Sequence, residues 1–331
     1  MPRQARLDAP GALHHVMGRG IEKTPIFRTD KDREDFLTRL GALCEGGLLN
    51  VFAWALLDNH FHLLIRTGKQ TLSESMRKLL TGYVVSFNRR YGRYGHLFQN
   101  RYKSILCEQD PYLLELTRYI HLNPIRAGVV KTMRQLAAYP WTGHGVIMGR
   151  IHRSWQDVDT VLSYFGKRRR EAIRKYERYV SEGVGMGKRL ELVGGGVIRS
   201  KGGWSEVVSL RRKCEREASD ERILGGGEFV ERVLEDAEER IKETLRWKKR
   251  VMDLKALLGE VCRREGLEEE EIRGRSRRES VVRGRKIICQ VAVRKLGYTG
   301  ASVARFLGMT TSSVNRMARQ EEVAESDEWD K

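Results

Sequence analysis

The sequence predicts an α+β protein, in which a small antiparallel sheet with helices on one face precedes an all-helical C-terminal region. Two observations support this prediction. Within residues 1–145, short runs rich in β-branched and aromatic residues alternate with segments whose apolar residues recur at helical spacing. From about residue 251 onwards the apolar spacing is helical and ends in a helix-turn-helix pattern.

The expected sheet contains a tight hairpin. Two apolar runs, residues 50–57 and 60–65, are separated only by Asp58-Asn59, which supplies turn chemistry. The other expected strands are residues 12–17 and 102–107. Helices are expected at residues 29–44, at 72–90, and from Pro111 to near Asn123-Pro124, where the proline ends the helix.

We expect four regions along the 331 residues. The α+β domain covers 1–145, and 146–250 is a basic connecting region with an expected helix at 155–180 and glycine runs, such as 194–196, read as turns or hinges. Residues 251–319 form a helical DNA-binding domain, and 320–331 are an acidic tail.

Charge indicates the class of partner. The chain has 62 Lys and Arg against 44 Asp and Glu, a net charge of +18, which favours a nucleic acid over a merely basic solvated surface. No segment approaches the ~20 uninterrupted apolar residues of a membrane span, so no membrane partner is expected. The five cysteines are scattered, and the N-terminus lacks the apolar core of a signal peptide, so we expect a cytoplasmic protein.

Residues 299–317 fit a helix-turn-helix, with Gly308 in the turn and Ala304 where the helices cross. We expect the second helix to contact duplex DNA through polar and basic side chains: Thr311, Ser312, Asn315 and Arg316. An ordinary helical hairpin is the alternative.

A histidine pair is the first candidate for chemistry. His60 and His62 lie two apart in an expected strand, where alternate side chains share a face, so both imidazoles can reach one metal ion. Such a pair is more often structural than metal-binding. A nucleophile and a third ligand nearby would favour chemistry.

The helix that begins near Pro111 supplies both. Tyr119 and Asn123 are four residues apart, so they point the same way. We expect Tyr119 to attack a phosphodiester as a covalent nucleophile, and Asn123 to offer an oxygen to the metal. Phosphodiester chemistry suits Mg²⁺ or Mn²⁺, and histidine ligands favour Mn²⁺. Tyr112 is the rival nucleophile, but its i+4 residue is Leu116, which cannot bind a metal.

Basic residues interleaved with aromatic rings suggest a single-stranded DNA surface, where cations meet phosphates and rings stack on bases. A solvated basic face is the alternative. The residues expected to contact DNA here are Arg19, Arg89, Arg90, Arg93, Arg101 and Lys103.

Three runs together resemble the REP-associated tyrosine transposases, a single-tyrosine branch of the HUH nuclease superfamily. They begin at Asn59-His60-Phe61-His62, at Gly95-His96-Leu97-Phe98 and at Arg118-Tyr119-Ile120-His121. The resemblance covers about residues 1–145 and implies a ferredoxin-like domain that cleaves single-stranded DNA at hairpin-flanked sites, leaving a 5′-phosphotyrosine. It assigns His60, His62 and Asn123 to the metal and Tyr119 to the attack.

Two points limit the resemblance. Asp58 stands where family members often have proline, in the hairpin turn. The C-terminal extension occurs in only part of the family, and its last segment is similar to the DNA-binding domain of the replication initiator DnaA.

Other functions stay open. A non-catalytic DNA-binding regulator would use the helix-turn-helix alone, and a metal-dependent hydrolase would use water in place of Tyr119. A monomer is slightly favoured over a homodimer.

Overall fold

The computed structural model describes residues 7, 11–68, 70–187, 189, 192, 220, 222–237, 253–274, 276–296 and 298–320. The chain divides into two compact units, residues 1–233 and 234–331. Each unit has its own apolar core. The expected acidic tail beyond residue 320 and the glycine run at 194–196 lie outside the described residues.

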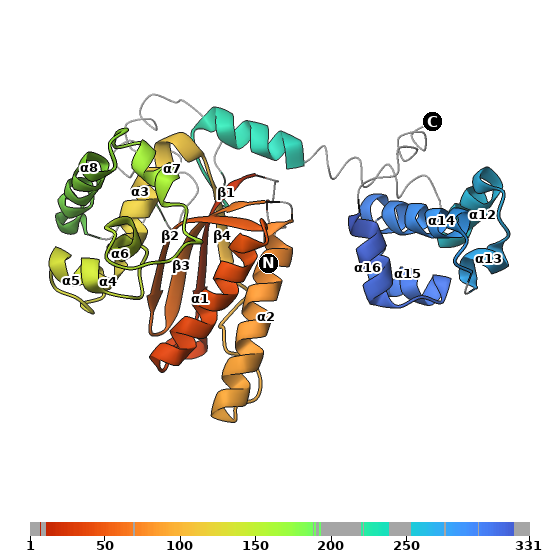
Figure 1. The fold of residues 1–331 in the computed structure, drawn as a ribbon, viewed down its shortest axis with the longest axis horizontal. Coiled ribbons are helices and arrows are strands. Elements are labelled where there is room, and N and C mark those ends of the chain that lie inside the picture. Colours follow the sequence, from red (N-terminus) through yellow and green to blue (C-terminus); the bar gives the residue numbers. More distant parts are fainter. Residues whose placement is uncertain are drawn as a thin grey trace. The chain divides into compact units, whose positions relative to one another are not determined.

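The first unit is built on one sheet (Figure 1). Its strands lie in the order β2-β3-β1-β4-β5, with antiparallel pairing among the first four and a parallel β4–β5 contact. The strands are β1 (Leu13–Arg19), β2 (Leu49–Leu57), β3 (His60–Thr67), β4 (Lys103–Cys107) and β5 (Ile223–Leu224). The predicted α+β class and antiparallel sheet are confirmed.

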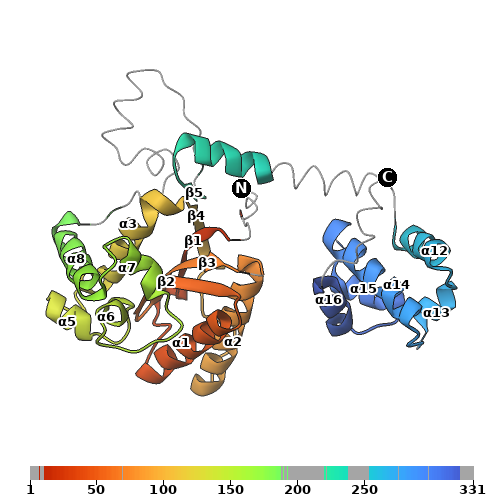
Figure 2. The same cartoon turned by 45° about the horizontal axis from the view of Figure 1, so that its top comes forward.

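Two helices cover one face of this sheet, as predicted (Figure 2). Helix α1 (Asp30–Glu45) packs against α2 (Leu72–Tyr91), and the Phe36 ring of α1 lies 5.1 Å from the Phe61 ring of β3. The Asp32 carboxylate caps α1 by accepting a hydrogen bond from the Thr29 N–H at 3.1 Å. The order βαββαβ and this strand order are those of a ferredoxin-like fold.

The opposite face is also covered, so the prediction of helices on one face only is wrong. Helix α3 (Gln109–His121) packs on β2 and β3, and its Tyr119 ring lies 6.1 Å from the ring of His62. Successive β3 side chains point to opposite faces, which places His62 and Phe61 on different sides. Because β2 and β3 are buried at nearly every position, both faces need helices.

Further helices continue this second layer: α4 (Asn123–Arg126), α5 (Met133–Ala138), α6 (His144–Ile147), α7 (Val158–Ser163) and α8 (Arg169–Glu182). The helix predicted at 155–180 is therefore two helices, separated around Gly166, whose φ of 137° no helix adopts. Val161, Tyr176 and Leu224 join the core of the first unit, although they lie in the predicted connecting region. The four-region division itself stays a prediction.

The second unit is helical in its described part. It contains α12 (Leu254–Glu265), α13 (Glu269–Arg273), α14 (Glu279–Gln290), a π-helical turn (Val291–Lys295), α15 (Gly300–Leu307) and α16 (Thr311–Arg319). Gly308 ends α15 with a φ of 65°, and the Thr310 hydroxyl caps α16 by accepting from the Ser313 N–H at 3.2 Å. The two helices of the predicted helix-turn-helix are thus present.

Candidate active site

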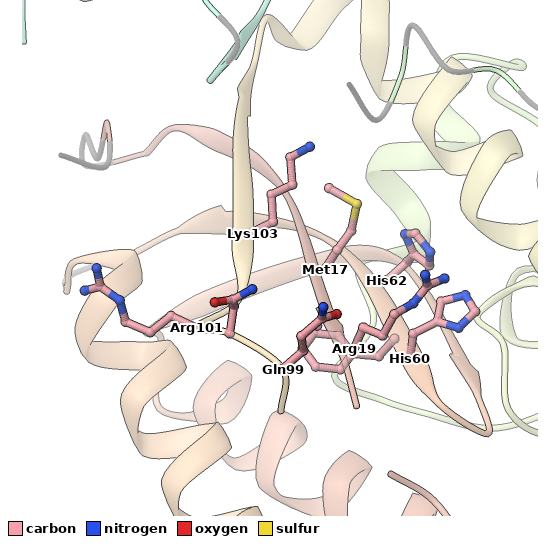
Figure 3. Close-up of a pocket in the computed structure, with 10 residues that line it drawn as sticks. Met17, Arg19, His60, His62, Gln99, Arg101 and Lys103 are labelled. Atoms are coloured by element: carbon pink, nitrogen blue, oxygen red, sulfur yellow. The ribbon is translucent and has the colours of Figure 1, made fainter. Parts of the chain in front are cut away.

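Strands β1 and β3 place the candidate residues on one face of the sheet. Arg19 pairs with His60, and Met17 pairs with His62, in the antiparallel register. Directly paired residues share a face, so these four side chains line one surface. A cavity of about 240 Å³ lies there, and it is also lined by Gly18, Phe61, Gln99, Asn100, Arg101 and Lys103. Figure 3 shows Arg19 extending towards His60 and His62, while Arg101 extends away from them.

The orientation of His60 is set by its neighbour. Asn59 donates an amide hydrogen to the Lys23 carbonyl at 3.0 Å, which turns its side-chain oxygen towards His60. The Nδ1–H of His60 then donates to that oxygen at 2.7 Å. In a neutral imidazole this leaves the lone pair on Nε2. Burial is the main cause that lowers the pKa of His60 to about 4, with Arg19 adding to the effect.

A chain of two hydrogen bonds orients His62 in the same way. His15 Nδ1 lies 3.3 Å from the Leu192 carbonyl, which can only accept, so this nitrogen carries the proton of His15. His15 Nε2 therefore accepts from the Nδ1–H of His62, at 3.0 Å. The lone pair of His62 is left on Nε2. Burial, followed by the charges of His15 and His60, lowers the pKa of His62 well below its ordinary value.

The ring of Tyr119 lies beside these histidines. Its centroid is 6.1 Å from that of His62 and 6.1 Å from that of His15, both edge-on. Arg126 fixes this ring: its guanidinium lies 4.8 Å from the ring centroid and donates to the Tyr119 carbonyl at 2.9 Å. Tyr112, the rival nucleophile, lies two turns and about 10 Å further along the helix axis.

Asn123, four residues after Tyr119, begins the short helix α4 and is 8% exposed. Its amide nitrogen donates to the Tyr119 carbonyl at 3.1 Å and to the Ile120 carbonyl at 3.2 Å. These two bonds occupy the amide hydrogens and leave the side-chain oxygen as the group that can bind a cation.

The donor set fits a metal with mixed nitrogen and oxygen ligands. His60 and His62 both direct their protons to neighbours and retain Nε2 lone pairs, as metal-bound histidines do. No three His, Cys, Asp or Glu side chains in the described part of the chain are arranged to hold a metal. The amide oxygen of Asn123 stays the predicted third donor, and water or phosphate oxygens would complete the coordination.

The six basic residues predicted to bind single-stranded DNA fall into two groups. Arg19, Arg101 and Lys103 line the cavity beside the histidines. The others lie around the C-terminal end of α2, away from the cavity lining: Arg89, Arg90 and Arg93. Arg90 forms an ion pair with the buried Asp32, and the Arg93 guanidinium lies 5.8 Å from the Phe87 ring. These two side chains therefore have structural contacts.

The residues predicted to read duplex DNA lie on α16. Thr311, Ser312 and Arg316 are exposed. Asn315 lies against the start of α15, because a Cβ atom at Gly300 would come within 2.1 Å of its side-chain oxygen. The small residue at position 300 thus allows the close approach of the two helices.

Two residues beside the site were not predicted to have a role. No sequence signal singles out His15, because the register that places it next to His62 joins residues 47 positions apart. Arg126 lies seven residues after Tyr119 in the sequence. On a helix this spacing of two turns places two side chains on one face, and it is the sequence signal that could have indicated a role for Arg126.

With this geometry in place, comparison with known proteins is informative. Residues 11–123 match the "Transposase IS200 like" family. The matched residues include His15, His60, His62, Tyr119 and Asn123. Arg126 lies just beyond them.

A solved structure, described as "Structure of the REP associates tyrosine transposase bound to a REP hairpin", is 15% identical with a TM-score of 0.38, covering 47% of this chain and 98% of that chain. No curated protein matches the chain. None of the helices in the described part of the chain is long and apolar enough to cross a membrane.

Proposed function

We propose that the chain is a DNA strand transferase that cleaves and rejoins single-stranded DNA at hairpin-flanked sites, through a covalent intermediate on Tyr119. One observation carries the proposal: the Tyr119 ring lies 6.1 Å from the His62 ring within one chain, beside a cavity lined by cations. The match of residues 11–123 to IS200-like transposases supports it.

In the proposed step, the phenol oxygen of Tyr119 attacks the phosphorus of the scissile phosphodiester. The new bond joins that oxygen to phosphorus, and the bond from phosphorus to the 3′ oxygen breaks. The phenol proton passes to solvent, and the leaving 3′ oxygen takes up a proton from solvent to become a 3′-OH. The reverse step, with a 3′-OH attacking the phosphotyrosine, rejoins a strand without any external energy source.

His60, His62 and Asn123 would hold Mg²⁺ or Mn²⁺. When bound, such an ion neutralises charge on the phosphate oxygens and polarises the phosphorus centre. The protein residues around it have separate tasks. Arg126 positions the tyrosine ring through contacts with the ring and backbone, and Arg19 extends to the same place as the histidines, where it can pair with the phosphate.

The tyrosine and the histidines of one protomer already lie together, which supports a monomer acting in cis. The exposed polar face of α16, with Thr311, Ser312 and Arg316, supports a second contact with duplex DNA. The net charge of +18 suits both contacts. A regulator that binds DNA without cutting it is the second candidate, favoured by this face alone.

The test uses a pool of labelled hairpin oligonucleotides with randomised single-stranded extensions, incubated with Mn²⁺ or Mg²⁺. We expect a protein–DNA adduct that survives denaturing electrophoresis and disappears in Tyr119→Phe, while Tyr112→Phe, the matched control, keeps it. Cleavage without an adduct would identify a hydrolase. Binding without cleavage or adduct would identify a regulator.

A further inference from the structure

A second cavity adjoins the candidate active site. It has a volume of about 750 Å³ and lies between α2 and residues 95–102. Gln99, Asn100 and Arg101 line both this groove and the smaller cavity with the histidines. The two spaces are therefore neighbours on the surface of the first unit.

The groove has an apolar base and a cationic edge. Met76, Leu80, Val84 and Phe98 contribute apolar side chains, and Val85 is 62% exposed at its rim. Exposed apolar side chains grouped in a groove mark a binding surface. The charged groups among the lining residues are cationic, Arg77 and Arg101, and no acidic side chain is found among the described residues that line it.

The difference in volume between the two cavities indicates that they bind different parts of a substrate. The cavity beside His60 and His62, at about 240 Å³, is smaller than the roughly 300–1,000 Å³ of pockets that enclose a small molecule. It suits a phosphate group and little more. A polymeric substrate has nucleotides on either side of that phosphate, and these need a surface of their own. The larger groove shares Gln99, Asn100 and Arg101 with the small cavity, so it is the nearest such surface among the described residues.

We propose that this groove binds unpaired bases of the single-stranded DNA next to the scissile phosphate. The proposal rests on the proposed function, because it takes the phosphate to lie beside Tyr119. Unpaired bases expose flat apolar faces that pack on apolar and aromatic side chains, and their phosphates pair with cations. Arg77 would pair with a phosphate, and the amides of Gln99 and Asn100 would face base edges.

Charge favours DNA over a second copy of this chain as occupant. An apolar groove edged only by cations repels a surface with a net charge of +18 and attracts a polyanion. Unpaired bases fit better than duplex, because paired and stacked bases hide the faces that an apolar groove contacts.

Two neighbouring cations on α2 give a matched pair for the test. Arg77 lines the groove, whereas Lys78 is outside it, is exposed, and donates to the Gln70 side chain at 3.0 Å. Arg77→Gln and Lys78→Gln remove the same charge from the same helix. Val85→Glu places a carboxylate in the groove at an exposed position, so folding should be unaffected.

The measurement is fluorescence anisotropy with the full chain carrying Tyr119→Phe, which keeps the strand intact. The probe is a labelled hairpin with a single-stranded extension, compared with the hairpin alone. We expect Arg77→Gln to reduce the slope of log affinity against log salt by about 0.7 for the extended probe, the value for one phosphate contact. Val85→Glu should lower the affinity for the same probe at least tenfold. Lys78→Gln should change neither the salt slope nor the affinity.

Equal effects of Arg77→Gln and Lys78→Gln, or equal effects on both probes, would overturn the proposal. So would a change of oligomeric state in Val85→Glu measured by light scattering, because the groove would then be an interface between copies. Failure of the proposed function would be seen separately. The wild-type protein would then form no covalent adduct with DNA, even if the groove variants lose affinity for the extended probe.

Discussion

The Nε2 atom of His15 lies 3.0 Å from the Nδ1 atom of His62, and this contact fixes which nitrogen of His62 keeps its lone pair. The Leu192 carbonyl holds the proton of His15 on its other nitrogen, 3.3 Å away. His62 can therefore present only Nε2 to a metal. His15 is a positioning residue in this account, since it acts through His62.

The first prediction concerns this contact. His15→Leu removes the acceptor and should weaken Mn²⁺ binding by about 10- to 100-fold, the usual effect of losing a hydrogen bond to a metal ligand. His15→Gln should retain much of the affinity, because its side-chain oxygen can accept from His62. The measurement is the electron paramagnetic resonance signal of free Mn²⁺ during titration.

His14→Leu is the matched control. His14 is as buried as His15 and adjacent to it, but it points to the other face of β1. If His14→Leu weakens Mn²⁺ binding as much as His15→Leu does, the effect comes from a general loss of stability and the hydrogen-bond account is wrong.

The second prediction separates two arginines that the sequence treats alike. Arg90 pairs with the buried Asp32, so Arg90→Gln should lower the free energy of unfolding by about 1–3 kcal/mol, as expected when a buried charged acceptor loses a partner. Arg101 is exposed at the cavity. Arg101→Gln should therefore lower the affinity of the protein for single-stranded DNA and leave its free energy of unfolding unchanged. Urea unfolding and anisotropy measure the two quantities, and the reverse pattern would refute the assignment.

A third prediction concerns α16. Arg316→Ala should lower duplex affinity and reduce its salt slope by about 0.9, the value for one phosphate contact on B-form DNA. Arg305 is equally exposed, on α15, and Arg305→Ala serves as the control, which should have a smaller effect. Indistinguishable salt slopes for these two variants would show that α16 is not the helix that enters the major groove of the duplex.

The fourth prediction is a pH dependence of stability. His144 is buried against Tyr176, whose hydroxyl lies 2.8 Å from its Nδ1, and against the ring of His121. Burial lowers the pKa of His144 to about 4, below its ordinary 6.5. The unfolded chain therefore binds the proton more tightly between these pH values. The contribution of His144 to the free energy of unfolding is fully present above about pH 6.5, and this free energy falls by about 3 kcal/mol by pH 4.

Urea unfolding at pH 7.5 and pH 5.0 tests this prediction. From the same two pKa values, His144→Gln should lose about 2 kcal/mol less stability over this interval than the wild type. An identical loss in both proteins would mean that His144 does not titrate with unfolding. His144 also contributes to the lowered pKa of His121, so the difference reports position 144 together with its effect on His121.

Much of the first unit could be predicted because its signals are local. The hairpin of β2 and β3 followed from two apolar runs around Asp58-Asn59, and α1 and α2 begin within a residue of where apolar spacing placed them. The proximity of Tyr119 to His62 was expected from their chemistry and from a family resemblance, and the distance now agrees with it.

What could not be predicted depends on contacts between distant segments. The register of β1 against β3 sets which of His14 and His15 faces His62, and a one-residue slip would exchange them. The second helical layer followed from burial of both faces of β2 and β3, which periodicity alone does not show. The packing of Asn315 on Gly300 likewise depends on how α15 and α16 meet.

The most direct test of the central claim is peptide mapping of the covalent adduct. After incubation with hairpin oligonucleotides and Mn²⁺, nuclease trimming and proteolysis, mass spectrometry should find the residual nucleotide 5′-phosphate on the peptide that contains Tyr119. A nucleotide phosphate on Tyr112 or on another residue would contradict the assignment. Cleaved DNA with an unmodified Tyr119 peptide under single-turnover conditions would contradict the mechanism itself.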